Sequence, residues 1–114
     1  MQQKTNLLDT VNGGELYEYK EVGRINGQML NVLKVADRTL EFHVHEDSDE
    51  AFYVIEGDFA LEFDDGLVQL KTGDLLIVPR GTRHRPICKS LVKILLLDMA
   101  EALNNENCGG TYSD

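Results

Sequence analysis

The feature that most constrains the fold is a succession of short apolar stretches separated by turn signals. Such stretches cover residues 15–21, 29–35, 39–45, 50–56, 59–63, 67–70, 75–78 and 92–97. Several of them alternate apolar and polar side chains with a period of two, as half-buried β-strands do, and none continues into the 3.6-residue period of a long helix. Asn26-Gly27 is a strong hairpin signal, because both residues tolerate positive φ. The pattern predicts an all-β barrel or sandwich.

The chain of 114 residues has the length of one domain. We expect an N-terminal arm over residues 1–14, the barrel over residues 15–99, and a loose polar tail over residues 100–114. The last apolar stretch, residues 92–97, is apolar on both faces. A strand that is apolar on both faces is expected in the centre of a sheet.

Charge and composition exclude several classes of function. A formal net charge of −9 argues against binding to a nucleic-acid backbone or to an anionic membrane surface. The N-terminus lacks the apolar core of a signal peptide, and no apolar run approaches the ~20 residues of a membrane span. The two cysteines form no CxxC pair and are expected to be free thiols. A cytoplasmic location is the default expectation.

All three histidines of the chain belong to one candidate site. His43 and His45 are two residues apart, so a strand would project both side chains from the same face. Glu50 opens the next apolar stretch, and His84 follows a Pro-containing turn. Three imidazoles and a carboxylate are typical ligands of a first-row metal ion. The imidazoles must be neutral to bind, so affinity should weaken below about pH 6.

The spacing of these residues resembles the two sequence motifs of the cupin family. The first motif is matched by His43-x-His45-x4-Glu50-x6-Gly57, and the second by Gly73-x5-Pro79-x-Gly81-x2-His84. Fifteen residues separate the motifs, as in small single-domain microbial cupins. Two positions depart from the pattern, because Asp37 replaces a glycine and Cys88 replaces an asparagine.

The resemblance implies a jelly-roll barrel, also called a double-stranded β-helix, with one divalent metal ion held inside. By position its ligands would be His43, His45, Glu50 and His84. Iron, manganese, nickel and zinc all suit such a site, and the ligand types do not select among them. In some sites of this kind the carboxylate leaves the metal and acts as a base, so Glu50 is also the candidate catalytic residue.

Three further residues are candidates for contacting a substrate. Arg83 and Arg85 flank His84 in an acidic chain and could pair with an anionic substrate, or they could form a solvated loop that balances nearby acids. Cys88 could place a thiol near the metal, or it could be a small buried apolar residue. Both alternatives remain open for each position.

Apolar residues on the strand faces opposite the ligands predict an interface. They are Leu40, Phe42, Val44, Tyr53 and Ile55. A contiguous apolar patch on a protein surface usually marks a contact with a partner. We expect a homodimer that buries these residues, and the alternative is that the N-terminal arm covers them.

These observations support two main functional hypotheses. The chain is either a metal-dependent enzyme, dioxygenase- or isomerase-like, that acts on a small polar or anionic metabolite, or a non-catalytic module that binds a small sugar or acid. A purely structural metal is the third possibility. Many unrelated functions share one fold, so the fold does not decide among them.

Overall fold

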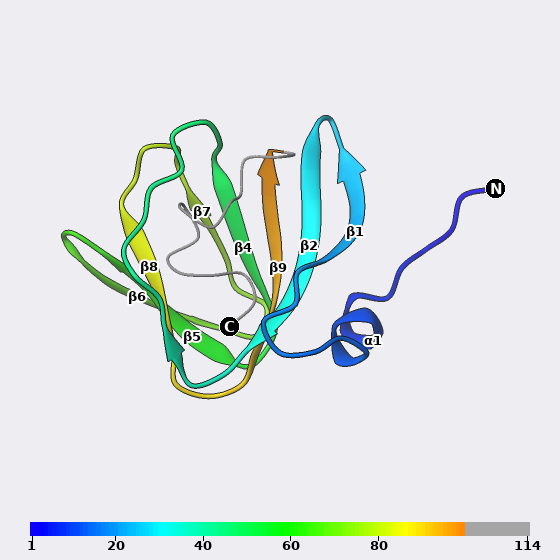
Figure 1. Ribbon diagram of the computed structural model, residues 1–114, viewed down its shortest axis with the longest axis horizontal. Helices are drawn as coiled ribbons and strands as arrows, with labels where there is room; N and C mark the ends of the chain where they lie inside the picture. Colours follow the sequence, from blue (N-terminus) through cyan, green and yellow to red (C-terminus); the bar gives the residue numbers. More distant parts are fainter. Residues whose placement is uncertain (100–114) are drawn as a thin grey trace.

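The computed structural model describes residues 1–99, which form a jelly roll of two facing antiparallel sheets (Figure 1). Residues 100–114, predicted to be a polar tail, lie outside the described residues. The elements are α1 (Leu7–Asn12), β1 (Lys20–Ile25), β2 (Gln28–Val35), β3 (Arg38–Thr39), β4 (Glu50–Glu56), β5 (Asp58–Phe63), β6 (Gly66–Lys71), β7 (Leu75–Val78), β8 (His84–Cys88) and β9 (Val92–Met99). One sheet has the order β1-β2-β9-β4-β7 and the other the order β3-β8-β5-β6. The predicted all-β architecture is confirmed.

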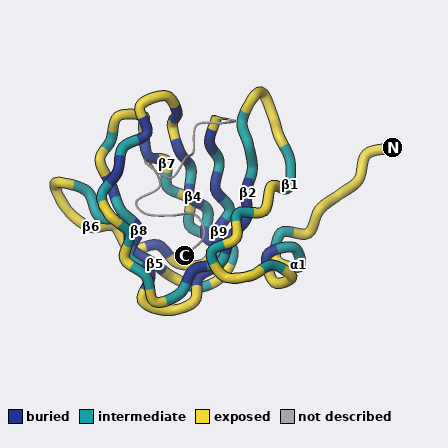
Figure 2. Tube along the Cα trace, in the orientation of Figure 1, coloured by how far each residue is buried: buried dark blue, intermediate teal, exposed yellow. Residues whose placement is uncertain are grey.

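Buried apolar residues of both sheets form one hydrophobic core, and buried segments appear in strands of both sheets (Figure 2). Along β4 the side chains of Phe52 and Val54 are buried, while Tyr53 between them is half-buried. The same alternation on β9 buries Ile94 and Leu96. Since β9 lies between β2 and β4, the prediction that this apolar strand is central is confirmed.

Two turns follow directly from residue type. Asn26 and Gly27 adopt φ angles of 51° and 77°, as a tight two-residue hairpin between β1 and β2 requires. Gly57 joins β4 to β5 with a φ of 106°. A Cβ atom at Gly57 would lie 2.7 Å from the carbonyl oxygen of Leu91, so this position has no room for a side chain.

The N-terminal region differs from the strand predicted over residues 15–21. Tyr17 has a φ of 66°, which interrupts an extended chain, so β1 begins only at Lys20. The predicted arm carries the short helix α1, which Asn6 caps through its side chain and which buries Val11. Within residues 1–99 no helix has the length and apolar character to span a membrane.

The prediction that Leu40, Phe42, Val44, Tyr53 and Ile55 form one apolar patch opposite the ligands is wrong. Pairing in the β3 ladder ends at Thr39, and Leu40 and His43 both line the interior although they are three residues apart. One extra residue in the extended chain breaks the period of two. Phe42 lies by the four-stranded sheet, while Tyr53 belongs to the five-stranded one. The five residues therefore do not form one surface.

Candidate metal centre

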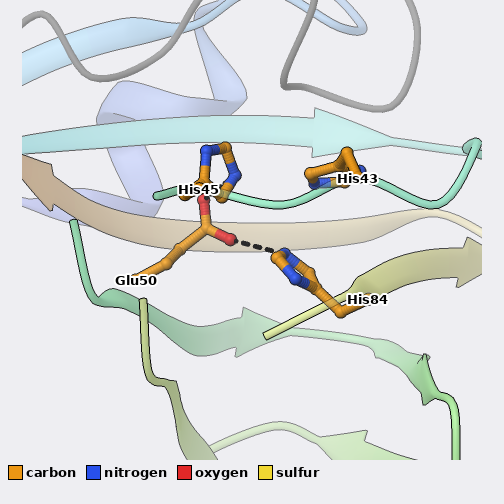
Figure 3. Close-up of side chains that lie close together, drawn as sticks. All are labelled: His43, His45, Glu50 and His84. Carbon is orange, nitrogen blue, oxygen red and sulfur yellow. Dashed lines mark hydrogen bonds and ion pairs between the residues drawn. The ribbon is translucent and has the colours of Figure 1, made fainter. Parts of the chain in front are cut away.

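The structure brings the four predicted metal ligands together inside the barrel (Figure 3). His43 and His45 lie in the segment between β3 and β4, Glu50 is the first residue of β4, and His84 is the first residue of β8. One ligand atom from each residue lies within 4.8 Å of those of the others. Ligands about 2.1 Å from one ion are separated by at most about 4.2 Å, so only a small contraction would be needed.

Backbone hydrogen bonds fix the positions of the histidines. The amide of His43 donates to the carbonyl of His84 over 2.9 Å, and the reverse bond is 3.0 Å long. The amide of Gly81, which has a φ of 78°, donates to the carbonyl of His45 over 2.9 Å. The turn that contains Pro79 and Gly81 therefore places His84 opposite the histidine pair.

Two of the imidazole rings are oriented by carbonyl groups. Nδ1 of His43 lies 2.9 Å from the carbonyl oxygen of Glu41, and Nδ1 of His84 lies 2.8 Å from that of Thr82. A carbonyl can only accept, so each Nδ1 carries the proton. Nε2 is then the atom that each ring directs toward the other ligands. Metal-binding histidines are commonly held in this way.

Glu50 faces two of the imidazoles at the centre of the cluster. Its Oε1 lies 2.9 Å from Nε2 of His84, and its Oε2 lies 3.3 Å from Nε2 of His45 without hydrogen-bond alignment. Both ring nitrogens of His45 are buried and have no hydrogen-bond partner among the described residues. Lone pairs that converge on one point, with a buried imidazole left unpartnered, fit a cation bound between them.

Burial and neighbouring groups shift the pKa values of His43 and Glu50 in the direction that favours metal binding. Burial lowers the pKa of His43 to about 4, which keeps this imidazole neutral and able to donate a lone pair. Burial alone would raise the pKa of Glu50, but the neighbouring His45 and His84 side chains outweigh it and lower the pKa to about 2. The carboxylate therefore remains ionised.

Asp98 is a buried acid near the site that the sequence reading missed. It lies on β9 one residue beyond the Ala51–Leu97 pair, which places it opposite Glu50. Its side chain is fully buried, and neither carboxyl oxygen has a hydrogen-bond partner of acceptable geometry within residues 1–99. Burial and the negative charge of Glu50 raise the pKa of Asp98 to about 10. In the sequence, the one feature that could have indicated this position is an acidic residue at the end of an apolar stretch.

The two arginines predicted to contact a substrate lie away from the four ligands. The guanidinium groups of Arg83 and Arg85 stack on the ring of Phe42, at 3.8 and 4.4 Å from its centroid. Arg83 pairs with Asp64, and Nε of Arg85 donates to Glu62 over 2.7 Å. Neither arginine lines the cavity at the metal centre. Contact with a substrate stays a prediction for both.

Cys88 lies inside the barrel as a buried free thiol. Burial raises the pKa of this thiol to about 12, so it is protonated at neutral pH. It lines an apolar cavity that adjoins the one beside the metal ligands, with Phe52 and Pro86 contributing to both.

Comparisons with known proteins agree with the fold. The sequence profile of the family described as Cupin domain matches residues 30–99. The Bacillus subtilis protein YdbB is 34% identical over 87 residues, which cover 75% of this chain and 76% of that protein. Acireductone dioxygenase from Gluconacetobacter diazotrophicus is 36% identical over 67 residues, 56% of this chain but only 37% of that enzyme.

A solved structure is similar over most of the barrel. It is a cupin-2 domain protein from Shewanella frigidimarina, with a TM-score of 0.76 and 26% sequence identity. The match covers 82% of this chain and 91% of that one.

Proposed function

Since the chain belongs to the cupin family, we propose that it binds one divalent metal ion through His43, His45, Glu50 and His84 and uses it as an enzyme. The observation that carries this proposal is the donor set itself. Two imidazoles are oriented through Nδ1, a third is buried without a hydrogen-bond partner, and an ionised carboxylate faces them. This combination supports catalysis at a metal ion better than a solvent-exposed cluster would.

In the proposed reaction the chain is dioxygenase- or isomerase-like and acts on a small molecule that has a polar or anionic group. The ion, which could be iron, manganese, nickel or zinc, would supply Lewis-acid chemistry or a site for oxygen activation. The ionised carboxylate of Glu50 would act as the base that accepts a proton from the substrate, because its oxygens lie beside two imidazoles at the centre of the cluster. The similarity to acireductone dioxygenase supports the oxygen-dependent form of this proposal.

The second candidate is a non-catalytic module that binds a small sugar or acid at the same metal. The fully buried His84 and the enclosed position of the four ligands suit either role. Tight binding without turnover would favour this candidate.

Metal-loaded protein and metal-free protein should be compared for turnover of hydroxy acids, sugars, diketones and thiols, with and without O2. The enzyme proposal expects conversion that depends on both the metal and Glu50, so Glu50→Gln serves as the inactive variant. If no compound of the panel is converted but one binds saturably in calorimetry, the enzyme proposal is wrong and the binding-module proposal is favoured.

The homodimer predicted from the sequence is now proposed to form on a different surface. This apolar sheet face comprises Ala51, Tyr53, Leu75, Ile77, Leu95 and Leu97 on the outward side of the five-stranded sheet. The β7 residues Leu75 and Ile77 are 60% and 59% exposed. We propose that it packs against the same face of a second copy, because an exposed apolar patch of adjacent cross-strand residues favours such a contact.

Charged side chains on this face should dissociate the dimer. The double variant Leu75→Glu with Ile77→Glu is expected to raise the dissociation constant at least about 100-fold, because each interface would bury unpaired carboxylates. Size-exclusion chromatography with light scattering measures the mass. Leu67→Glu is the matched control, since Leu67 is 50% exposed on β6 of the other sheet. A wild-type monomer, or dissociation by both substitutions alike, would contradict the proposal.

A further inference from the structure

The candidate metal centre adjoins an apolar cavity, which we call the apolar chamber. Its walls come from both sheets and from the segment after β3, and the main lining residues are Leu33, Val35, Leu40, Phe52, Ile94 and Leu96. The cavity beside His43, His45 and Glu50 shares Leu40, Phe52 and Leu96 with this chamber. A molecule bound to the metal would therefore have its remaining atoms directed along these side chains.

The chamber offers a bound molecule very little polar chemistry. Apart from the metal-ligand residues, the polar side chains of residues 1–99 that line either cavity are those of Tyr19 and Cys88. The Cys88 thiol is uncharged, because burial raises its pKa to about 12. No lysine or arginine of the described chain lines these cavities, and Arg83 and Arg85 are paired with acids elsewhere.

We propose that the natural ligand of the metal centre has one polar or anionic group that binds the metal and an uncharged apolar body, a short alkyl chain or a small ring, that occupies the apolar chamber. This inference rests on the proposed metal site. It narrows the substrate class, because polyhydroxylated sugars and dicarboxylic acids would place polar groups against Leu33, Ile94 and Leu96.

The size of the chamber limits the apolar body. Its cavity volume is about 40 Å³, and that of the space beside the ligands is about 30 Å³. A buried water needs at least about 10–15 Å³ on this scale, so each space holds a few water-sized groups. The apolar body should accordingly be a few carbon atoms long.

Energetics predict how affinity depends on the body of the ligand. Each methylene moved from water into an apolar space should tighten binding about fourfold. A hydroxyl group placed at the same depth without a hydrogen-bond partner should weaken binding about tenfold or more. The two effects have opposite signs, so a pair of ligands that differ by a methyl-to-hydroxyl exchange separates them.

The first experiment examines the chamber without any metal. Methyl resonances of the chelator-treated protein are recorded by NMR under xenon pressure, because xenon enters dry apolar cavities. We expect xenon-dependent shifts for the methyl groups of Leu33, Leu40, Ile94 and Leu96. The exposed Leu67 is the internal control. Shifts absent from the chamber methyl groups, or equal to those of Leu67, would overturn the inference whether or not the protein binds metal.

The second experiment uses Zn²⁺-loaded protein and a series with a constant metal-binding group. Dissociation constants are measured for glycolate, lactate, 2-hydroxybutyrate and 2-hydroxypentanoate, which differ by successive methylenes, and for glycerate, in which a hydroxyl replaces the terminal methyl of 2-hydroxybutyrate. We expect about fourfold tightening per methylene until the chamber is full, and glycerate weaker than 2-hydroxybutyrate by at least about tenfold. Equal affinities, or glycerate the tightest, would overturn the inference.

A filled chamber should remove the dependence on chain length. Cys88→Phe adds bulk to the chamber wall, and Cys88→Met is a gentler alternative if the phenylalanine variant does not fold. Either should reduce the gain in affinity per methylene to less than about twofold, and an unchanged gain would count against the chamber.

The Zn²⁺ content of every sample separates this inference from the proposed function. Protein that binds no Zn²⁺ contradicts the proposed function, whereas full Zn²⁺ content with no chain-length effect contradicts only this inference.

Discussion

Replacement of His84 by alanine should reduce the affinity for the divalent metal by more than about 100-fold. Losing a residue that only hydrogen-bonds a metal ligand costs up to about 100-fold, and losing a ligand itself should cost more. The imidazole belongs to one of the four proposed ligands, and its Nε2 lies 2.9 Å from Glu50 Oε1 at the centre of the cluster. Its removal also leaves Glu50 buried without that partner. Metal content after dialysis, measured by elemental analysis, and competition with a chelator give the change in affinity.

A matched pair of carboxylate variants controls for charge. Glu50→Gln and Glu46→Gln remove the same charge, but Glu50 is 3% exposed within the cluster whereas Glu46 is exposed in the preceding loop. Glu50→Gln should lower metal affinity strongly, and Glu46→Gln should leave it within about threefold, the change expected from a screened surface charge. Full metal content in the His84→Ala and Glu50→Gln proteins would refute the site.

The clustering of the four candidate ligands could be predicted, because the residues that indicate it are few and two of them are close in sequence. The chain has three histidines, and two of them share a strand parity that needs no tertiary information. His84 is distant in sequence from the other three residues, but it follows the turn residues Pro79 and Gly81, which belong to the same motif. Motif spacing therefore located a site whose members come from three separate segments.

The parts that escaped prediction depend on local backbone irregularity. The period of two assumes an unbroken extended chain, so it placed Leu40 opposite the ligands. Leu40 instead lines both interior cavities, because an extra residue precedes His43. Tyr17 adopts positive φ, and its hydroxyl donates to the carbonyl of Ala36, a contact that no residue pattern announces.

Asp98 could not be predicted to lie near the site for a different reason, since its position beside Glu50 depends on strand pairing. The register of β4 against β9 places it opposite Glu50, although 47 residues separate the two along the chain, as their numbers show. Similarly, the apolar chamber is assembled from Leu33, Phe52 and Ile94, which sequence alone assigns only to a general core. The residue types in the sequence indicated the candidate metal site, whereas the pairing register of the strands determines which residues surround it.

The pairing of Asp98 with Glu50 predicts an unusual dependence of stability on pH in the metal-free protein. The pKa of Asp98 is raised to about 10 from 3.8, so at neutral pH the folded protein holds a proton that the unfolded chain releases. This contribution is fully present below about pH 4 and is lost as pH rises toward 10. Asp98→Asn removes the titration while it keeps the shape. The free energy of unfolding of the variant, relative to wild type, should therefore increase by about 1.4 kcal/mol per pH unit between about pH 6 and 8.

Denaturant titrations in the presence of a chelator measure this difference at each pH. Effects of the histidines largely cancel, because both proteins retain them. Asp49→Asn is the matched control. Its carboxyl is exposed and accepts from the Arg80 amide over 2.9 Å, which lowers its pKa, so it is ionised in both states above about pH 6. The Asp49→Asn difference should be flat over this range. A flat difference for Asp98→Asn would mean that Asp98 is ionised in the folded protein, and that two buried carboxylates are held together by another cation.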